Sequence, residues 1–116
     1  MPVTRINPGP RMSQAVIHGN TVYLAGQVAA NPTPSVKEQT QQILSQIDEL
    51  LKQAGTDKSK LVSTNIWITD IRNFAEMNAA WDAWVVPGST PARATVEARL
   101  AAPAYLVEIM VVAAKD

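Results

Sequence analysis

The segment LVEIMVVAA, Leu106 to Ala114, constrains the fold most, because it is apolar in both phases of a strand's alternation. A strand with one face in water should be polar at every second position. Both faces of the predicted sheet should therefore be covered. Two helices can cover one face, and a chain of 116 residues has nothing left for the other. We expect a second subunit to cover that face, in a closed symmetric homo-oligomer.

The first half of the chain reads as a hairpin followed by a helix. Residues 13–17 and 21–25 favour strands on either side of the turn-rich spacer His18-Gly19-Asn20. Ser35 and Glu38 have the spacing of a helix N-terminal capping box, and Gly55 suits a helix C-terminus because it accepts a left-handed conformation. The apolar residues between them fall on one helical face: Ile43, Leu44, Ile47, Leu50, Leu51 and Ala54.

The second half predicts a strand, a second helix and two further strands. Residues 61–69 read as the strand. Asn73 and Glu76 have capping-box spacing, and Pro87-Gly88 ends the helix that follows. Residues 92–100 and 105–114 read as two strands joined by a short turn rich in Ala and Pro. The predicted order is β-β-α-β-α-β-β, an α+β layered sheet in a single domain spanning residues 1–116.

Composition excludes several classes of function. Ten basic residues balance ten acidic ones without a long run of either sign, so the positive surface that binds a nucleic-acid backbone is not expected. Cysteine is absent and there is one histidine, His18, which argues against a zinc site and a thiol nucleophile. The N-terminus lacks an apolar signal core, and no apolar run reaches the ~20 residues that span a bilayer. We expect a cytoplasmic protein without membrane partners.

Arg93 stands near the start of the predicted strand at 92–100. Strand alternation places it on one face with Thr95, Glu97 and Arg99. If that face meets a neighbouring subunit, the guanidinium is partly desolvated and needs an anion. Glu97 lies roughly 13 Å along the strand at ~3.3 Å per residue, too far for direct pairing. The anion is therefore either an acid elsewhere, such as Glu108 or one from another subunit, or an external carboxylate.

Several segments, in this order, resemble the RidA/YjgF family of reactive-intermediate deaminases: RMSQAV, VYLAGQV, the helix ending QAG, FAEMNAAW, TPARATVEARL and VEIMVVAA. The combination of SQA, GQ, PAR and VEI is specific, and the stretch WDAWVVPG is similar to a short-chain subgroup. The resemblance implies a chorismate-mutase-like subunit, in a homotrimer with sheets packed inward, helices outside and a cleft at each subunit interface.

The resemblance also implies an activity that needs no cofactor and no metal. It is the hydrolysis of 2-imino or enamine acids, formed from 2-aminoacrylate or 2-aminocrotonate, to 2-keto acids and ammonia. Arg93 would hold the substrate carboxylate near the backbone N–H of Gly26. The backbone carbonyl of Thr95 would accept a hydrogen bond from the imine nitrogen, and Glu108 would orient or deprotonate water. A protonated imine is already electrophilic, so positioning and proton transfer suffice.

The sequence departs from the family pattern at three positions. Met12 replaces an aromatic residue before SQA, Ala25 replaces a serine before GQ, and Thr95 replaces a cysteine. Threonine in place of cysteine should be tolerated at position 95, because the resemblance implies that this residue acts through its backbone. The lost hydroxyl groups affect the expected substrate preference and efficiency more than the reaction type.

Other interpretations remain open for individual residues. Glu108 is either a site residue or a strand residue paired with Arg99 or Arg93, and its face depends on strand register. Asn78 matches a family asparagine and is either a cleft residue or a structural one. The tryptophans at 67, 81 and 84 are expected to be packing residues, with a place in the cleft wall as the alternative. His18 is expected to lie in a surface loop. For the whole chain, the alternative to a deaminase is a module that binds a small carboxylate or keto acid, or a trimeric interaction protein, without turnover.

Overall fold

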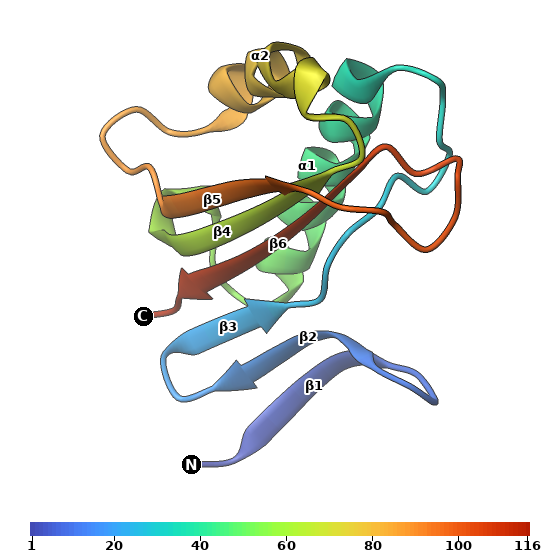
Figure 1. Cartoon of the computed structure of the whole chain (residues 1–116). Coiled ribbons are helices and arrows are strands. Elements are labelled where there is room, and N and C mark those ends of the chain that lie inside the picture. Colours follow the sequence, from blue (N-terminus) through green and yellow to red (C-terminus); the bar gives the residue numbers. More distant parts are fainter.

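The computed structural model describes all 116 residues as one sheet with two helices packed against it (Figure 1). The strands are β1 (Val3–Pro8), β2 (Ser13–His18), β3 (Thr21–Leu24), β4 (Leu61–Ile68), β5 (Ala92–Glu97) and β6 (Val107–Ala114). The helices are α1 (Val36–Gln53) and α2 (Phe74–Trp84), preceded by the short helical turns η1 (Lys58–Lys60) and η2 (Ile71–Asn73). The sheet order is β1-β2-β3-β6-β4-β5. This confirms the predicted α+β class.

Helix α1 begins and ends at the predicted residues. The Ser35 side chain accepts a hydrogen bond from the Glu38 N–H at 3.2 Å. At the other end Gly55 has φ 84°, and the Thr56 N–H donates to the Leu51 carbonyl at 2.9 Å. Such a bond closes the last turn of a helix and satisfies a carbonyl that lacks a helical partner.

The helices form the core with one face of the sheet. The buried positions of β6, Val107, Ile109, Val111 and Ala113, alternate along the strand and face α1. They join the buried stripe of α1, including Ile43, Ile47 and Leu51, in one apolar cluster. These side chains supply most of the hydrophobic stabilisation, since burying each one contributes about 1.5–3 kcal/mol.

The second face of the sheet is covered by no element of the chain (Figure 1). Register places a set of apolar side chains on that open face: Val16, Tyr23, Trp67, Val96, Met110 and Val112. Tyr23 and Val96 are 47% and 50% exposed. A contiguous apolar surface of this kind is typical of a protein–protein interface.

The strands differ from the predicted ones in three ways. Strand β1 was not predicted, because Val3–Pro8 lies between prolines and lacks a clear apolar alternation. It pairs only with β2, as an edge strand. The two last strands do not form a hairpin, because β4 lies between them and pairs in parallel with β5 and antiparallel with β6. Strand β5 also ends at Glu97 rather than at residue 100.

The expected capping box of α2 is also wrong. Asn73 makes no side-chain cap, and the Glu76 carboxylate accepts instead from the Lys37 N–H of α1 at 3.4 Å. The turn before α2 is capped by Asp70, which accepts from the Arg72 N–H at 3.0 Å. Because η2 precedes α2, the capping residue is Asp70, three residues before the predicted Asn73.

Neither helix is long and apolar enough to cross a membrane.

Candidate functional site

Arg93 faces the helix layer of the sheet. Its Cα is aligned with that of Thr64 on β4, which is 2% exposed beneath the helices. The Arg93 Nη1 donates to Asn78 Oδ1 on α2 at 2.8 Å. The guanidinium carbon lies 5.7 Å from the ring centroid of Phe74 and 5.3 Å from that of Trp81. Helix α2 therefore desolvates Arg93 within one chain. Contact of this region with a neighbouring subunit stays a prediction.

No carboxylate of the chain neutralises Arg93. The chain has two ion pairs, Lys60 with Asp116 and Arg72 with Asp70. Glu97 on the same strand accepts from the Ile71 N–H at 3.0 Å. Burial lowers the pKa of the Arg93 guanidinium from its ordinary value, and the charge of Asp82 opposes this without forming an ion pair. Arg93 is thus a half-buried cation whose Nε–Nη2 edge makes no hydrogen bond within the chain.

Thr95 follows Arg93 on the same face. Its hydroxyl oxygen is buried and has no hydrogen-bond partner. The Ala98 N–H donates to the Ile68 carbonyl of β4 at 2.9 Å. Because backbone groups alternate in direction along a strand, the carbonyl of Thr95 then points away from β4, toward the free edge of β5. A ligand at that edge finds an unpaired acceptor there.

Glu108 and Gly26 lie together on the other face. Gln27 and Ile109 exchange backbone hydrogen bonds of 2.8 and 3.1 Å in an antiparallel bridge, which makes Gly26 and Glu108 diagonal neighbours on the open face. A Cβ on Gly26 would overlap Glu108 Oε2 and lie 3.0 Å from its Cδ. Glycine at 26 therefore lets the carboxylate approach the backbone. Glu108 is half-buried and pairs with neither Arg93 nor Arg99.

Met12 lies beyond this second group, in the connection between β1 and β2. It is 49% exposed, and its carbonyl accepts from the Gly9 N–H at 2.7 Å. Strand β2 follows at once, and its Gln14 carbonyl accepts from the Ala25 N–H at 2.9 Å. Met12 is therefore connected to the Gly26 segment and separated from Arg93 by the width of the sheet.

The predicted site residues thus form two groups within one chain. Arg93, Thr95 and Asn78 lie on the helix side at the β5 edge. Glu108 lies opposite Trp67 on β4, which is three residues from Thr64 and so projects from the other face. Strand register, left open by the sequence, therefore places Arg93 and Glu108 on opposite faces.

Sequence reasoning missed the two rings that contact Arg93. Phe74 was not singled out, and Trp81 was expected to pack or to line a cleft without a link to Arg93; Trp81 is 5% exposed. The signal was the spacing: positions 74, 78 and 81 lie on one face of a helix, so an asparagine between two aromatics marks a polar contact within an apolar stripe. Only the position of β5 under α2 shows that the contact is Arg93.

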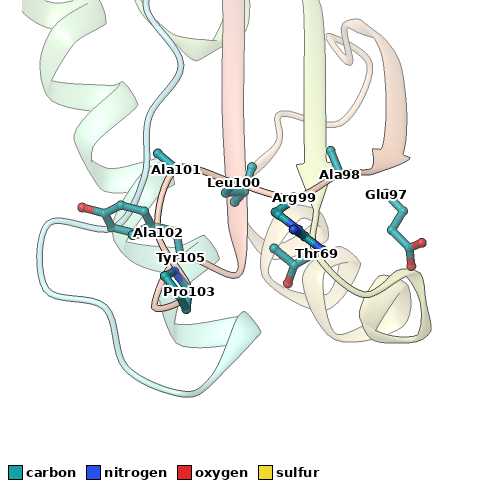
Figure 2. A pocket seen from close by; sticks show the side chains of 9 residues that line it. All are labelled: Thr69, Glu97, Ala98, Arg99, Leu100, Ala101, Ala102, Pro103 and Tyr105. Carbon is teal, nitrogen blue, oxygen red and sulfur yellow. The ribbon is translucent and has the colours of Figure 1, made fainter.

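The largest cavity of the chain lies elsewhere, where β5 ends (Figure 2). It has a volume of about 770 Å³ and is lined by Thr69, Glu97, Ala98, Arg99, Leu100, Ala101, Ala102, Pro103 and Tyr105. Figure 2 shows Arg99 beside Thr69, with Glu97 turned toward the η2 turn. None of the predicted site residues lines it. Its one cation, Arg99, is exposed and makes no hydrogen bond or ion pair within the chain, whereas Arg93 is held by Asn78 and two rings.

No group of three or more His, Asp or Glu side chains with metal-ligand geometry occurs.

The chain is similar to several known proteins. Residues 3–115 match the sequence profile of a family described as endoribonuclease L-PSP. The RutC family protein YoaB of Escherichia coli is 46% identical over 114 residues, covering 98% of this chain and 99% of that protein. A RutC family protein of Haemophilus influenzae is 43% identical over 114 residues, covering 97% and 98%.

Solved structures show the same fold. The crystal structure of a YjgF family member from Neisseria meningitidis superposes with a TM-score of 0.97 at 43% identity, covering 100% of this chain and 97% of that one. A member of the Rid protein family from Yersinia pestis superposes with a TM-score of 0.86 at 35% identity, covering 92% and 90%. By sequence profile, by relatives along nearly its whole length and by fold, the chain belongs to the YjgF/RidA family.

Proposed function

We propose that this protein hydrolyses 2-imino acids, and the enamines that tautomerise to them, to 2-keto acids and ammonium. The reacting species is a protonated imine that carries a carboxylate. Water adds to the imine carbon, the C–N bond breaks, and the two protons of water with the two on the iminium nitrogen leave as ammonium. The observation that carries the proposal is Arg93, a half-buried guanidinium with no carboxylate partner in the chain.

The surroundings of Arg93 suit a carboxylate clamp. Asn78 holds one end of the guanidinium, and the Nε–Nη2 edge is free to donate two parallel hydrogen bonds. Desolvation by α2 strengthens the attraction to an anion, because a charge pair interacts more strongly in a lower dielectric. The Thr95 carbonyl at the same edge is placed to accept from an iminium N–H, which orients the imine carbon.

Glu108 is the proposed base that orients or deprotonates the attacking water. It cannot meet a substrate bound to Arg93 of the same chain, because the sheet separates the two side chains. A complete site needs the open face of one copy, with Glu108, Gly26 and Met12, placed at the β5 edge of another. We place the site between subunits for this reason.

A closed ring of three copies meets both requirements. A head-to-tail contact between the open face and the β5 edge is heterologous, and such contacts close into cyclic oligomers. The ring also buries the apolar side chains of the open face, including Tyr23 and Val96. A homotrimer with sheets inward and helices outside is the proposed assembly, and a mass measurement by light scattering tests it. A stable monomer at micromolar concentration would contradict it.

The direct test of activity couples this protein to an amino-acid dehydratase that releases 2-iminopropanoate or 2-iminobutanoate. Addition of the protein should speed keto-acid formation beyond the spontaneous rate. Arg93→Ala should lower kcat/KM at least about a hundredfold, since two charge-assisted hydrogen bonds are lost. Arg72→Ala is the matched control, because that arginine is exposed and paired with Asp70. Full activity in Arg93→Ala would overturn the clamp.

Mixing two inactive variants tests the shared site. Arg93→Ala and Glu108→Ala each remove one half, and random reassembly of the mixture into trimers restores about a quarter of the sites if the halves come from different subunits. A site within one subunit would give no recovery. The measurement is the imine-hydrolysis activity of the two variants after they are denatured and refolded together. It is compared with the activity of each variant refolded alone.

The same experiments separate catalysis from binding without turnover. A non-catalytic carboxylate binder would bind 2-ketobutanoate through Arg93, by calorimetry, yet leave imine hydrolysis at the spontaneous rate. The family description names an endoribonuclease. We do not favour RNA as the substrate, because the formal net charge is zero and the one histidine, His18, is exposed. His18 ends strand β2 rather than lying in the predicted surface loop.

A further inference from the structure

The neighbours of Arg93 form a connected aromatic support on α2. Phe74, Asn78 and Trp81 lie on one face of the helix, and all three contact the guanidinium. Phe74 is 38% exposed, whereas Trp81 is 5% exposed and is the more firmly packed of the two rings. A cation near a ring face within about 6 Å is attracted by the ring's quadrupole.

Trp81 is itself held by a second tryptophan. Its ring centroid lies 5.5 Å from that of Trp84, with the planes tilted by 50°. The Trp84 Nε1 donates to Asp48 Oδ2 of α1 at 3.0 Å. Lys58 Nζ lies 5.2 Å from the Trp84 ring centroid and donates to the Trp84 carbonyl at 2.7 Å. Contacts therefore run without a break from α1 and η1 through Trp84 and Trp81 to Arg93.

We propose that Trp81, braced by Trp84, is a positioning residue that orients the Arg93 guanidinium in place of a protein carboxylate. The role rests on the proposed function of Arg93 as a carboxylate clamp. A carboxylate partner would hold the guanidinium equally well but would neutralise it. A ring attracts the cation through its face and leaves the in-plane N–H groups and the net charge available to a ligand. The support thus fixes the side chain and keeps it able to bind.

A purely structural role for Trp81 makes a different prediction. Packing alone depends on volume, and a leucine or phenylalanine in its place would affect Arg93 similarly once the protein is folded. A positioning role depends on the ring, so phenylalanine should preserve it and leucine should not.

The first measurement uses the unmodified protein without ligand. Side-chain ¹H–¹⁵N spectra of the arginines should show the Arg93 Nε–H shifted upfield by ring currents relative to Arg5 and Arg11, which are exposed. The resonance is assigned by its loss in Arg93→Lys. The shift should persist in Trp81→Phe and largely disappear in Trp81→Leu. An Arg93 resonance at the position of the exposed arginines in the unmodified protein would overturn the proposal, even if Trp81→Leu does not fold.

The second measurement is the affinity for 2-ketobutanoate by calorimetry. Trp81→Leu should weaken it about three- to thirtyfold, the range expected for one lost cation–π contact, and Trp81→Phe by about threefold or less. In the imine assay Trp81→Leu should raise KM by a similar factor and leave kcat nearly unchanged. The reason is that the lost contact weakens the binding of the substrate and of the transition state equally. Unchanged affinity in folded Trp81→Leu would contradict the proposal.

Asp48→Ala tests the brace at a surface position that touches neither Arg93 nor substrate. Asp48→Ala removes the hydrogen bond that the Trp84 indole N–H donates. The Arg93 Nε–H signal should therefore broaden or shift, and the affinity for 2-ketobutanoate should fall by less than in Trp81→Leu. Glu49→Ala is the matched control, an exposed neighbour on the same helix. Equal Arg93 spectra in the two variants would show that Trp84 does not brace the site.

The outcomes separate this proposal from the proposed function. An upfield Arg93 resonance and Trp81-dependent carboxylate binding without imine hydrolysis would refute the enzyme and keep the support. Imine hydrolysis that needs Arg93, with no upfield shift and no effect of Trp81→Leu, would refute the support and keep the enzyme.

Discussion

Arg93 and Glu108 project from opposite faces of one sheet, although each lies on a strand that pairs with β4. The sheet therefore separates the two side chains within one chain. In the assembly that we propose, Arg93 of one copy and Glu108 of another complete each site. The same contact would bury the open apolar face around Glu108.

Asn78→Asp should turn the ligand site of Arg93 into an internal ion pair. The new carboxylate replaces an amide oxygen 2.8 Å from Arg93 Nη1 and neutralises the guanidinium. We expect the affinity for 2-ketobutanoate to fall about tenfold or more, since a charged hydrogen bond contributes about 1.5–3 kcal/mol. Asn78→Ala, which removes the contact without adding charge, should have a smaller effect. Equal losses in both variants, measured by calorimetry, would show that Asn78 acts only by its shape.

Gly26→Ala should displace the Glu108 carboxylate. A Cβ at this position overlaps Oε2, the movable end of the side chain, so the fold should survive while the carboxylate turns away. Imine hydrolysis should fall about tenfold or more, in the range by which a misplaced acid–base group loses its contribution. The control is Gly26→Ala in a Glu108→Ala background, where it should lower the rate of imine hydrolysis very little further. A further tenfold fall of that rate in the Glu108→Ala background would mean that Gly26 acts independently of Glu108.

Gln39→Leu should destabilise the fold strongly. The Gln39 amide is fully buried, donates to the Thr33 and Ala104 carbonyls at 2.6 and 2.9 Å, and accepts from the Leu106 N–H at 2.9 Å. Leucine leaves these groups without partners, so the free energy of unfolding should fall by about 3 kcal/mol or more. Urea denaturation measures it, and Gln41→Leu at an exposed position of the same helix is the control. A change below about 1 kcal/mol would show that water replaces the amide.

Asp70 should titrate far below an ordinary aspartate. The Arg72 side chain, then the Arg72 backbone N–H, lower the pKa of Asp70 from 3.8 to about 2. Folding therefore favours the ionised form, and the contribution of Asp70 to stability is present above pH 3.8 and lost as the pH falls through about 2. NMR titration of the side-chain carboxyl carbon measures the pKa directly. Arg72→Gln should move it back toward 3.8, and an unchanged value would exclude Arg72 as the main cause.

Local patterns in the sequence determined the elements whose causes are local. The cap at Ser35, the apolar stripe of α1 and the left-handed Gly55 depend on residues within a few positions of one another, and the structure shows all three. The apolar residues in both phases of β6 predicted that a second subunit covers the other face of the sheet. In the single chain that face is open and apolar, and its covering by another subunit stays a prediction. The combination of SQA, GQ, PAR and VEI identified the family for the same reason, since each of these motifs is local.

Only the tertiary structure decided which strands pair and which faces side chains share. Strand pairing depends on contacts between distant segments, so the sequence could not show that β4 separates β5 from β6 or that β1 adds an edge. That pairing puts Arg93 under Asn78 and Trp81, and Glu108 beside Gly26 on the reverse of the sheet. Local chemistry specifies what each residue can do, whereas the packing of distant segments specifies which residues can act together.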